Sequence, residues 1–96
     1  MNRNLWLGII ADDRLVSVGN TFLTDFVSNI HTVATHKSHR NKGYATSVVS
    51  ALLKEILQTN NLALIHVLED NIPARRVYEK VGFKIYRNYL YGFAEM

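Results

Sequence analysis

The stretch from Thr35 to Ala45 contains the residues whose types and spacing could bind a phosphate group. It reads Thr-His-Lys-Ser-His-Arg-Asn-Lys-Gly-Tyr-Ala, with an apolar segment before it and a long amphipathic helical pattern after it. Where a strand runs through a basic glycine-containing loop into a helix, the free N–H groups of the first helical turn point outward, and the helix dipole adds partial positive charge. Gly43 lets the backbone approach a ligand closely or adopt a positive φ angle. The loop therefore predicts a phosphate-binding site, with Arg40 and Lys42 supplying charge.

A second set of polar side chains accompanies a helix that is predicted to begin around Pro73. Proline is favoured in a first helical turn and pushes Ile72 towards an extended conformation. Asn71 is therefore expected just before the helix, with its side chain free. Tyr78 carries a phenol, which can donate a hydrogen bond. Because Tyr78 lies on an apolar helix face, it could equally be a tyrosine that packs in the core.

Composition predicts one small domain that spans residues 1–96. Of the 96 residues, 48% are hydrophobic and 20% are charged, and there is no cysteine, which excludes disulfides, thiolate metal sites and a cysteine nucleophile. The net charge of +3 suits a polyanionic partner, either nucleic acid or a phosphorylated cofactor, although a solvated basic surface without a partner would look the same. Neither a membrane span nor a signal peptide is apparent, which favours the cytosol.

The apolar patterns predict a mixed sheet with two helices, in the order β, β, β, α, β, α, β, β. A central strand–helix–strand unit places two strands in parallel, in an otherwise largely antiparallel α/β (α+β) sheet. The expected strands are Leu5 to Ala11, Leu15 to Phe22 (joined by an Asp12-Asp13 turn), Asn29 to Thr35, Leu62 to Leu68, Phe83 to Tyr86 and Tyr89 to Ala94. The expected helices are Thr46 to Gln58 and the segment from Pro73 to a stop at Gly82.

Three finer predictions concern individual positions. Gly19 indicates a bulge or a close backbone approach within its strand. Phe22 and Phe26 are expected in the core rather than in a substrate wall. If the third strand alternates strictly, one face carries Asn29, His31, Val33 and Thr35, and the other carries Ile30, Thr32 and Ala34.

Two motifs together resemble those of the GNAT superfamily of acyl-CoA-dependent N-acetyltransferases. The spacing Arg40-x-x-Gly43-x-Ala45 resembles its pyrophosphate-binding loop, and the segment from Asn71 to Phe83 fits its pattern Asn-x-x-Ala-x-x-x-Tyr-Glu-Lys-x-Gly-Phe. The resemblance covers nearly the whole chain and is closest to the short families that comprise only the C-terminal part of the GNAT fold. It implies an enzyme that moves an acetyl group from acetyl-CoA to a primary amine by direct attack on the thioester.

The resemblance also implies roles for individual residues. Backbone N–H groups of the loop would bind the CoA pyrophosphate, and the backbone from Val33 to Thr35 would pair with pantetheine, which requires the two parallel strands to splay apart. Asn71 would hydrogen-bond pantetheine, and Tyr78 would donate a proton to the departing thiolate. The implied cofactor-binding residues are Val33, Thr35, Arg40, Asn41, Lys42, Gly43, Tyr44, Ala45 and Asn71.

The general base is not evident from the sequence. Some relatives carry a glutamate at the position that best matches Asn29. His31 could serve as the base, since histidine titrates in the right range, and a water chain without a dedicated base is an equally good hypothesis. His36 and His39 are three residues apart, but no cysteine or carboxylate cluster accompanies them, so a metal site is not expected.

The chain departs from a full GNAT domain because about one strand and two helices are missing before Leu5. Those elements usually form much of the acceptor site, so the sequence predicts only a small-molecule or peptide amine. The missing elements favour an alternative, a CoA-binding or regulatory module without efficient catalysis. A nucleic-acid binder fits less well, because the aromatic residues are not interleaved with the basic ones, and no membrane partner is expected. Uncovered sheet edge predicts self-association, with Tyr86 to Phe93 as the candidate surface.

Overall fold

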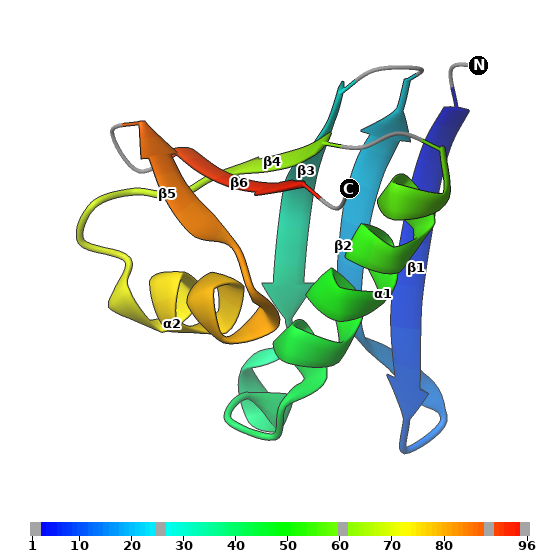
Figure 1. The fold of residues 1–96 in the computed structure, drawn as a ribbon. Coiled ribbons are helices and arrows are strands. Elements are labelled where there is room, and N and C mark those ends of the chain that lie inside the picture. Colours follow the sequence, from blue (N-terminus) through cyan, green and yellow to red (C-terminus); the bar gives the residue numbers. More distant parts are fainter. Residues whose placement is uncertain (1–2, 25–26, 60–61, 88–89, 95–96) are drawn as a thin grey trace.

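A six-stranded sheet with two helices forms the frame of the protein (Figure 1). The computed structural model describes residues 3–24, 27–59, 62–87 and 90–94. The strands are β1 (Arg3–Ala11), β2 (Arg14–Leu23), β3 (Val27–Thr35), β4 (Leu62–His66), β5 (Lys84–Arg87) and β6 (Leu90–Ala94). The two helices are α1 (Tyr44–Thr59) and α2 (Ile72–Val81), and a short 3₁₀ turn, η1 (Lys37–His39), precedes α1. This order confirms the predicted succession of strands and helices.

The strands lie in the order β1-β2-β3-β4-β6-β5. β3 and β4 pair in parallel, whereas the other neighbours pair antiparallel, so the predicted mixed sheet with a central β3-α1-β4 unit is confirmed. Helix α1 packs across β1, β2 and β3 and also contacts α2, which puts both helices on one face of the sheet (Figure 1). Neither helix in the described part of the chain has the length and apolar character to span a membrane.

The first two strands form the predicted hairpin. Asp12 and Asp13 connect them with φ angles of 55° and 61°. A two-residue loop with positive φ at both positions matches the twist of an antiparallel pair, and Asp is among the residues that tolerate this conformation. The turn brings the Asp12 side chain to the end of the sheet where β3 leads into η1.

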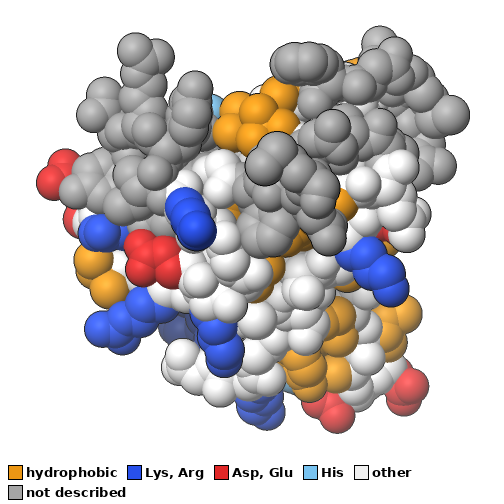
Figure 2. Space-filling model, in the orientation of Figure 1, with side chains coloured by type: hydrophobic (Ala, Val, Ile, Leu, Met, Phe, Trp, Pro, Cys, Tyr) orange, Lys and Arg blue, Asp and Glu red, His pale blue; other side chains and the backbone are white. Residues whose placement is uncertain are grey.

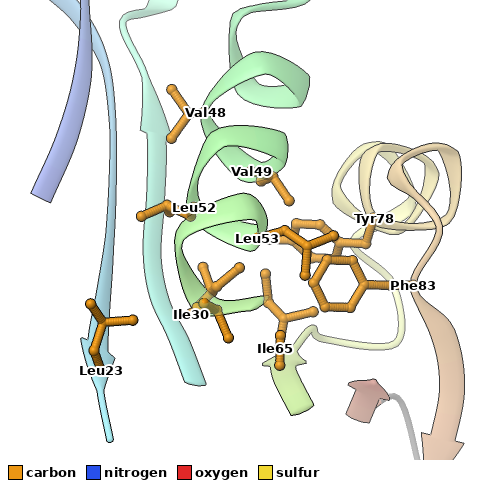
Figure 3. Close-up of a cluster of buried hydrophobic side chains, with 11 residues drawn as sticks. Leu23, Ile30, Val48, Val49, Leu52, Leu53, Ile65, Tyr78 and Phe83 are labelled. Carbon is orange, nitrogen blue, oxygen red and sulfur yellow. The ribbon is translucent and has the colours of Figure 1, made fainter. Parts of the chain in front are cut away.

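The core lies between α1 and the sheet (Figure 3). The apolar face of α1 predicted from its helical period is buried, and it packs against Ile30 of β3, Ile65 of β4 and Phe83. The buried residues of α1 are Val48, Val49, Leu52, Leu53 and Ile56. Burial of one helical stripe therefore fixes α1 against the strands that precede and follow it.

The core position predicted for Phe22 is wrong. Its side chain is 39% exposed, because Thr21 and Leu23 on either side point into the core and successive strand residues face opposite sides of a sheet. Phe26 lies outside the described residues.

β3 does not alternate strictly, so the condition on its two predicted faces is not met. β2 residues Thr21 and Asn20 pair with Ile30 and Thr32, so His31 is an extra residue that forms a bulge. Beyond the bulge, Val33 packs against the same core as Ile30. The parallel pairing with β4 ends at the same place, since Ile30↔Ile65 is its last pair. From there β3 and β4 separate, as the resemblance implied.

Gly19 provides the close backbone approach that its position predicted. A Cβ at Gly19 would lie 2.4 Å from Val48 Cγ1 and 2.7 Å from Leu52 Cδ1, both in the buried face of α1. We expect Gly19→Ala to lower the free energy of unfolding by about 1–3 kcal/mol, because the helix must move to admit the methyl group. Urea unfolding measures this loss.

Gly8→Ala is the matched control for that substitution. Its Cβ would lie 2.6 Å from Leu15 Cδ1, but Leu15 is 57% exposed and its side chain can move away. We expect Gly8→Ala to change stability by less than about 0.5 kcal/mol. Equal losses in the two variants would contradict the packing of α1 on Gly19.

Candidate functional site

A cavity of ≈ 800 Å³ opens where β3 and β4 separate. This volume falls within the range of about 300–1,000 Å³ that is typical of ligand sites. The far end of β3, the loop that leads into α1 and the length of α2 form its walls. The lining residues are Val33, Ala34, Thr35, His39, Arg40, Asn41, Gly43, Tyr44, Ala45, Thr46, Asn71, Pro73, Ala74, Arg76, Val77, Tyr78 and Lys80.

The loop presents backbone donors to this cavity. Asn41 and Gly43 have φ angles of 63° and 82°, and the first helical hydrogen bond runs from Ser47 N–H to the Gly43 carbonyl at 3.0 Å. The N–H groups of Tyr44 and Ala45 therefore have no acceptor within the helix. A Cβ at Gly43 would meet nothing within 4 Å. This open space at the positive end of α1 fits a bound anion.

The charged residues of the lining are all basic. They are Arg40 from the loop and Arg76 and Lys80 from α2, and no Asp or Glu is among the described lining residues. Figure 2 shows Lys and Arg side chains gathered over α2 and over the loop before α1. Arg40 also donates from Nε to the Thr35 carbonyl at 3.3 Å, which ties the loop to the end of β3. The cavity therefore favours a polyanionic ligand.

The free side chain predicted for Asn71 is wrong. Asn71 is the N-cap of α2, and its Oδ1 accepts a hydrogen bond from Ala74 N–H at 3.3 Å. Asparagine is a preferred N-cap, and Pro73 in the first turn needs no acceptor for its own nitrogen. Asn71 still lines the cavity. Because the cap uses Oδ1, its Nδ2 group is the part of the side chain suited to meet a ligand acceptor.

Tyr78 belongs to the core and to the cavity wall. Its side chain is 8% exposed, and its ring lies edge-on to Phe83 with 6.3 Å between the centroids (Figure 3). Burial raises the pKa of the Tyr78 phenol above its ordinary value of 10.0. The phenol therefore remains protonated at neutral pH and can act as a donor towards a group in the cavity.

The cavity includes all but two of the residues predicted for the site. Lys42 and His31 are exposed and lie outside the lining, His31 at the bulge of β3. Asn29 Oδ1 is buried and has no hydrogen-bond partner among the described residues. The base role suggested for His31 stays a prediction, and its position gives it no support.

Sequence reasoning missed part of the lining. Arg76 and Lys80 belong to no predicted site motif, although their spacing of four residues places them on one face of α2. On the same helix, Pro73 lies three residues before Arg76, and Val77 lies three residues before Lys80. This spacing predicts that the four side chains face the same side of α2 and line the cavity together. No local pattern around His39 indicates that its side chain is buried in the loop.

The parallel strands that separate above a basic glycine loop and the N-terminus of α1 define the class of the protein. This is the fold of the GNAT superfamily of N-acetyltransferases. The family model described as FR47-like protein matches residues 6–91, and the chain belongs to this family.

Solved structures share the fold at low sequence identity. The ribosomal-protein-S18-alanine N-acetyltransferase of Escherichia coli matches with a TM-score of 0.84 and 16% identity, over 96% of this chain and 69% of that one. The PaiA N-acetyltransferase of Thermoplasma acidophilum, in complex with coenzyme A, matches with a TM-score of 0.83 and 15% identity, over 96% and 61%. A Bacillus subtilis acetyltransferase in complex with CoA matches with a TM-score of 0.84 and 17% identity, over 98% and 78%. Comparison of the sequence with curated proteins returned no match.

Proposed function

We propose that this chain binds acetyl-CoA and transfers the acetyl group to a primary amine. The observation that carries the proposal is the cavity itself, in which separated parallel strands, exposed helix N–H groups and basic walls converge on the open space above Gly43. Structural neighbours that hold CoA or acetyl-CoA support the same ligand.

The residues present fit each part of such a ligand. The loop around Gly43 offers N–H donors to the pyrophosphate, and Arg76 and Lys80 add charge from α2. The edge of β3 that faces β4 has no pairing partner in β4 beyond Ile30, so the backbone from Val33 to Thr35 can pair with the amides of pantetheine.

Acetyl-CoA supplies an activated thioester. A main-chain N–H of the Val33 to Thr35 segment polarises its carbonyl oxygen, which favours attack by a neutral amine on the carbonyl carbon. As the C–S bond breaks, the phenol of Tyr78 gives its proton to the departing thiolate. The proton lost by the amine goes to water, and water returns a proton to the Tyr78 phenolate, so the protein is regenerated.

The acceptor is proposed only as a class, a small-molecule or peptide amine. The Escherichia coli neighbour acts on the alanine of a ribosomal protein, according to its name. This chain spans 61% to 78% of the lengths of the three neighbours described above. The activities and substrates of those longer proteins are therefore not assigned to it. Self-association also stays a prediction, since the side chains of the proposed Tyr86 to Phe93 surface lie largely outside those described.

One observation favours the alternative of a CoA-binding module without efficient catalysis. The described lining holds no carboxylate, and its one histidine, His39, is buried at 5% exposure with both ring nitrogens engaged. The lining thus lacks a ready general base.

Calorimetric titration and a thiol-release assay test the two candidates together. We expect acetyl-CoA and CoA to bind, and acetyl-pantetheine, which lacks the pyrophosphate, to bind much more weakly. Thiol release that depends on an added amine would support the enzyme. Tight binding without release across a panel of amines would support the module, and absence of binding would exclude both.

A further inference from the structure

The sheet face opposite the two helices carries a group of exposed apolar side chains. Alternate residues of β1 pack against the core, so the residues between them face away from it. Two of these outward residues are Trp6, which is 56% exposed, and Ile10, which is 73% exposed. Leu15 and Phe22 of the neighbouring strand β2 are 57% and 39% exposed.

These four side chains form one continuous patch, here called the β1–β2 patch. Ile10 pairs directly with Leu15, and a Cβ at Gly8 would lie 2.6 Å from Leu15 Cδ1, so Leu15 lies over Gly8. Gly8 is two residues from both Trp6 and Ile10, and Trp6 is diagonal to Phe22 across the strand pair. Neither α1 nor α2 covers the patch, because both helices pack on the other face of the sheet (Figure 1).

The polar groups of this face are suited to burial. Asn20, which pairs with Trp6, donates from Nδ2 to Asn4 Oδ1 and to the Leu5 carbonyl, the latter at 3.1 Å. No outward residue of the two strands carries a charge; these residues are Asn4, Trp6, Gly8, Ile10, Leu15, Val18, Asn20 and Phe22. A partner can therefore cover this face without removing a charge from water, which would be costly.

The size of the patch matches that of a small interface. The exposed parts of its four side chains amount to roughly 400 Å² of apolar surface, if a whole large side chain presents about 150–250 Å². A standard interface buries about 800 Å² on each partner, and about 65% of a homodimer interface, or roughly 500 Å², is apolar. The β1–β2 patch thus supplies most of the apolar area that a small dimer needs.

We propose that the β1–β2 patch is the contact surface between two copies of this chain, whose uncovered sheet faces pack together about a two-fold axis. A two-fold contact brings the same surface from both copies together, so an uncharged apolar patch meets its own complement. Sheets pack face to face about 10 Å apart, and neither needs a pocket. A nucleic acid or a lipid surface would instead favour basic residues, and the outward residues of β1 and β2 include none.

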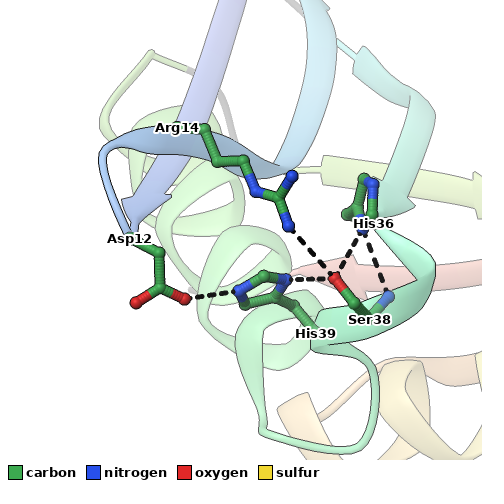
Figure 4. A network of polar contacts seen from close by, with 5 residues as sticks. All are labelled: Asp12, Arg14, His36, Ser38 and His39. Carbon is green, nitrogen blue, oxygen red and sulfur yellow. Dashed lines mark hydrogen bonds and ion pairs between the residues drawn. The ribbon is translucent and has the colours of Figure 1, made fainter.

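The hairpin that carries the patch is fixed to the rest of the chain. At its turn, Asp12 Oδ2 lies 2.9 Å from His39 Nε2 (Figure 4). Beside the turn, Arg14 Nη2 donates to Ser38 Oγ at 3.5 Å. Both contacts join the hairpin to the loop before α1. The surface offered to a second copy is therefore formed before the copies meet, which lowers the conformational cost of association.

The contact surface is independent of the proposed function, because the helices that line the cavity lie on the other face of the sheet. Sedimentation equilibrium over a range of protein concentrations tests it directly. We expect the mass to rise from one chain to two with a midpoint in the micromolar range. Trp6 is the one tryptophan of the chain, so its fluorescence emission should move to shorter wavelength with the same midpoint.

Ile10→Lys and Leu68→Lys are matched variants for this test. The two side chains are 73% and 74% exposed, and each change adds one positive charge, but Leu68 follows β4 and lies outside the patch. We expect Ile10→Lys to weaken dimerisation by more than about 100-fold, because two like charges would meet in an apolar interface. Leu68→Lys should dimerise like the parent, and both variants should keep its melting temperature. Leu15→Lys repeats the test at the position that pairs with Ile10, should Ile10→Lys fail to fold.

Three results would overturn the proposal. The first is a parent that stays monomeric up to millimolar concentration. The second is equal dimerisation of the patch and control variants, which would place the contact elsewhere, for example on the Tyr86 to Phe93 surface. The third is a monomer whose Trp6 emission moves only when phosphatidylcholine vesicles are added, which would assign the patch to a membrane.

Discussion

Tyr78→Phe lowers the rate of acetyl transfer by about 10²- to 10⁴-fold, the usual contribution of one positioned acid. The substitution removes the hydroxyl and keeps the ring in its place against Phe83, where the side chain is 8% exposed. The affinity for acetyl-CoA should change little, because the donors proposed for the pyrophosphate lie on the loop around Gly43. Steady-state thiol release and a binding titration, measured on the same preparations, separate the two quantities.

A purely structural Tyr78 predicts a different result. Loss of one hydrogen bond would shift stability by about 1 kcal/mol and leave turnover nearly unchanged. The melting temperature of the Phe variant is therefore the control. Parental turnover in that variant would reduce Tyr78 to a packing role and favour the non-catalytic module.

The pH dependence of the parent follows from the raised pKa of Tyr78. Because burial disfavours the phenolate, the phenol keeps its proton up to a pH above 10.0. We expect turnover to show no loss of this acid between neutral pH and that value. The same shift means that the folded state loses stability relative to the unfolded state as the pH rises past 10.0, and that the Phe variant lacks this contribution.

Gly43→Val is expected to weaken CoA binding by more than about 100-fold, which corresponds to two hydrogen bonds to a charged group. The valine side chain would fill the open space above the loop, where a Cβ at Gly43 meets nothing within 4 Å. It would also strain the backbone, since φ is 82° and a β-branched residue rarely adopts that angle. Calorimetry with CoA measures the loss.

Gly43→Ala separates strain from occlusion. An L-residue in the left-handed region costs about 1–2 kcal/mol, so alanine introduces backbone strain without the bulk of valine. The smaller alanine should retain more CoA affinity than valine. Parental affinity in Gly43→Val would show that the loop is not the anion site.

Local patterns in the sequence determined most of the secondary structure. The helical period from Val48 to Ile56 predicted the buried face of α1, because a single helix repeats its contacts every three to four residues. Asp12-Asp13 predicted the hairpin, and Gly82 ended α2 with a φ of 120°. The order of the basic loop and the Asn71 to Phe83 motif predicted the fold of the GNAT superfamily. The helix face, the turn and the helix end each depend on residues that are close together in the chain, and the motifs are read directly from it. The sequence alone therefore predicts them.

Tertiary structure alone decided the features that depend on distant partners. The bulge at His31 lies in the pairing with β2, at the place where the pairing with β4 ends, so no pattern within β3 revealed it. Phe22 is exposed because it lies on the sheet face opposite α1, which carries no helix in the described structure. Its exposure depends on which face of the sheet the helices cover, and its own hydrophobicity does not reveal that. The hydrogen bond between Asp12 and His39 joins residues 27 positions apart and connects the β1–β2 turn to the loop before α1. Hydrogen-bond geometry and burial act only between groups that the fold brings together, so these properties appear only when the chain is folded.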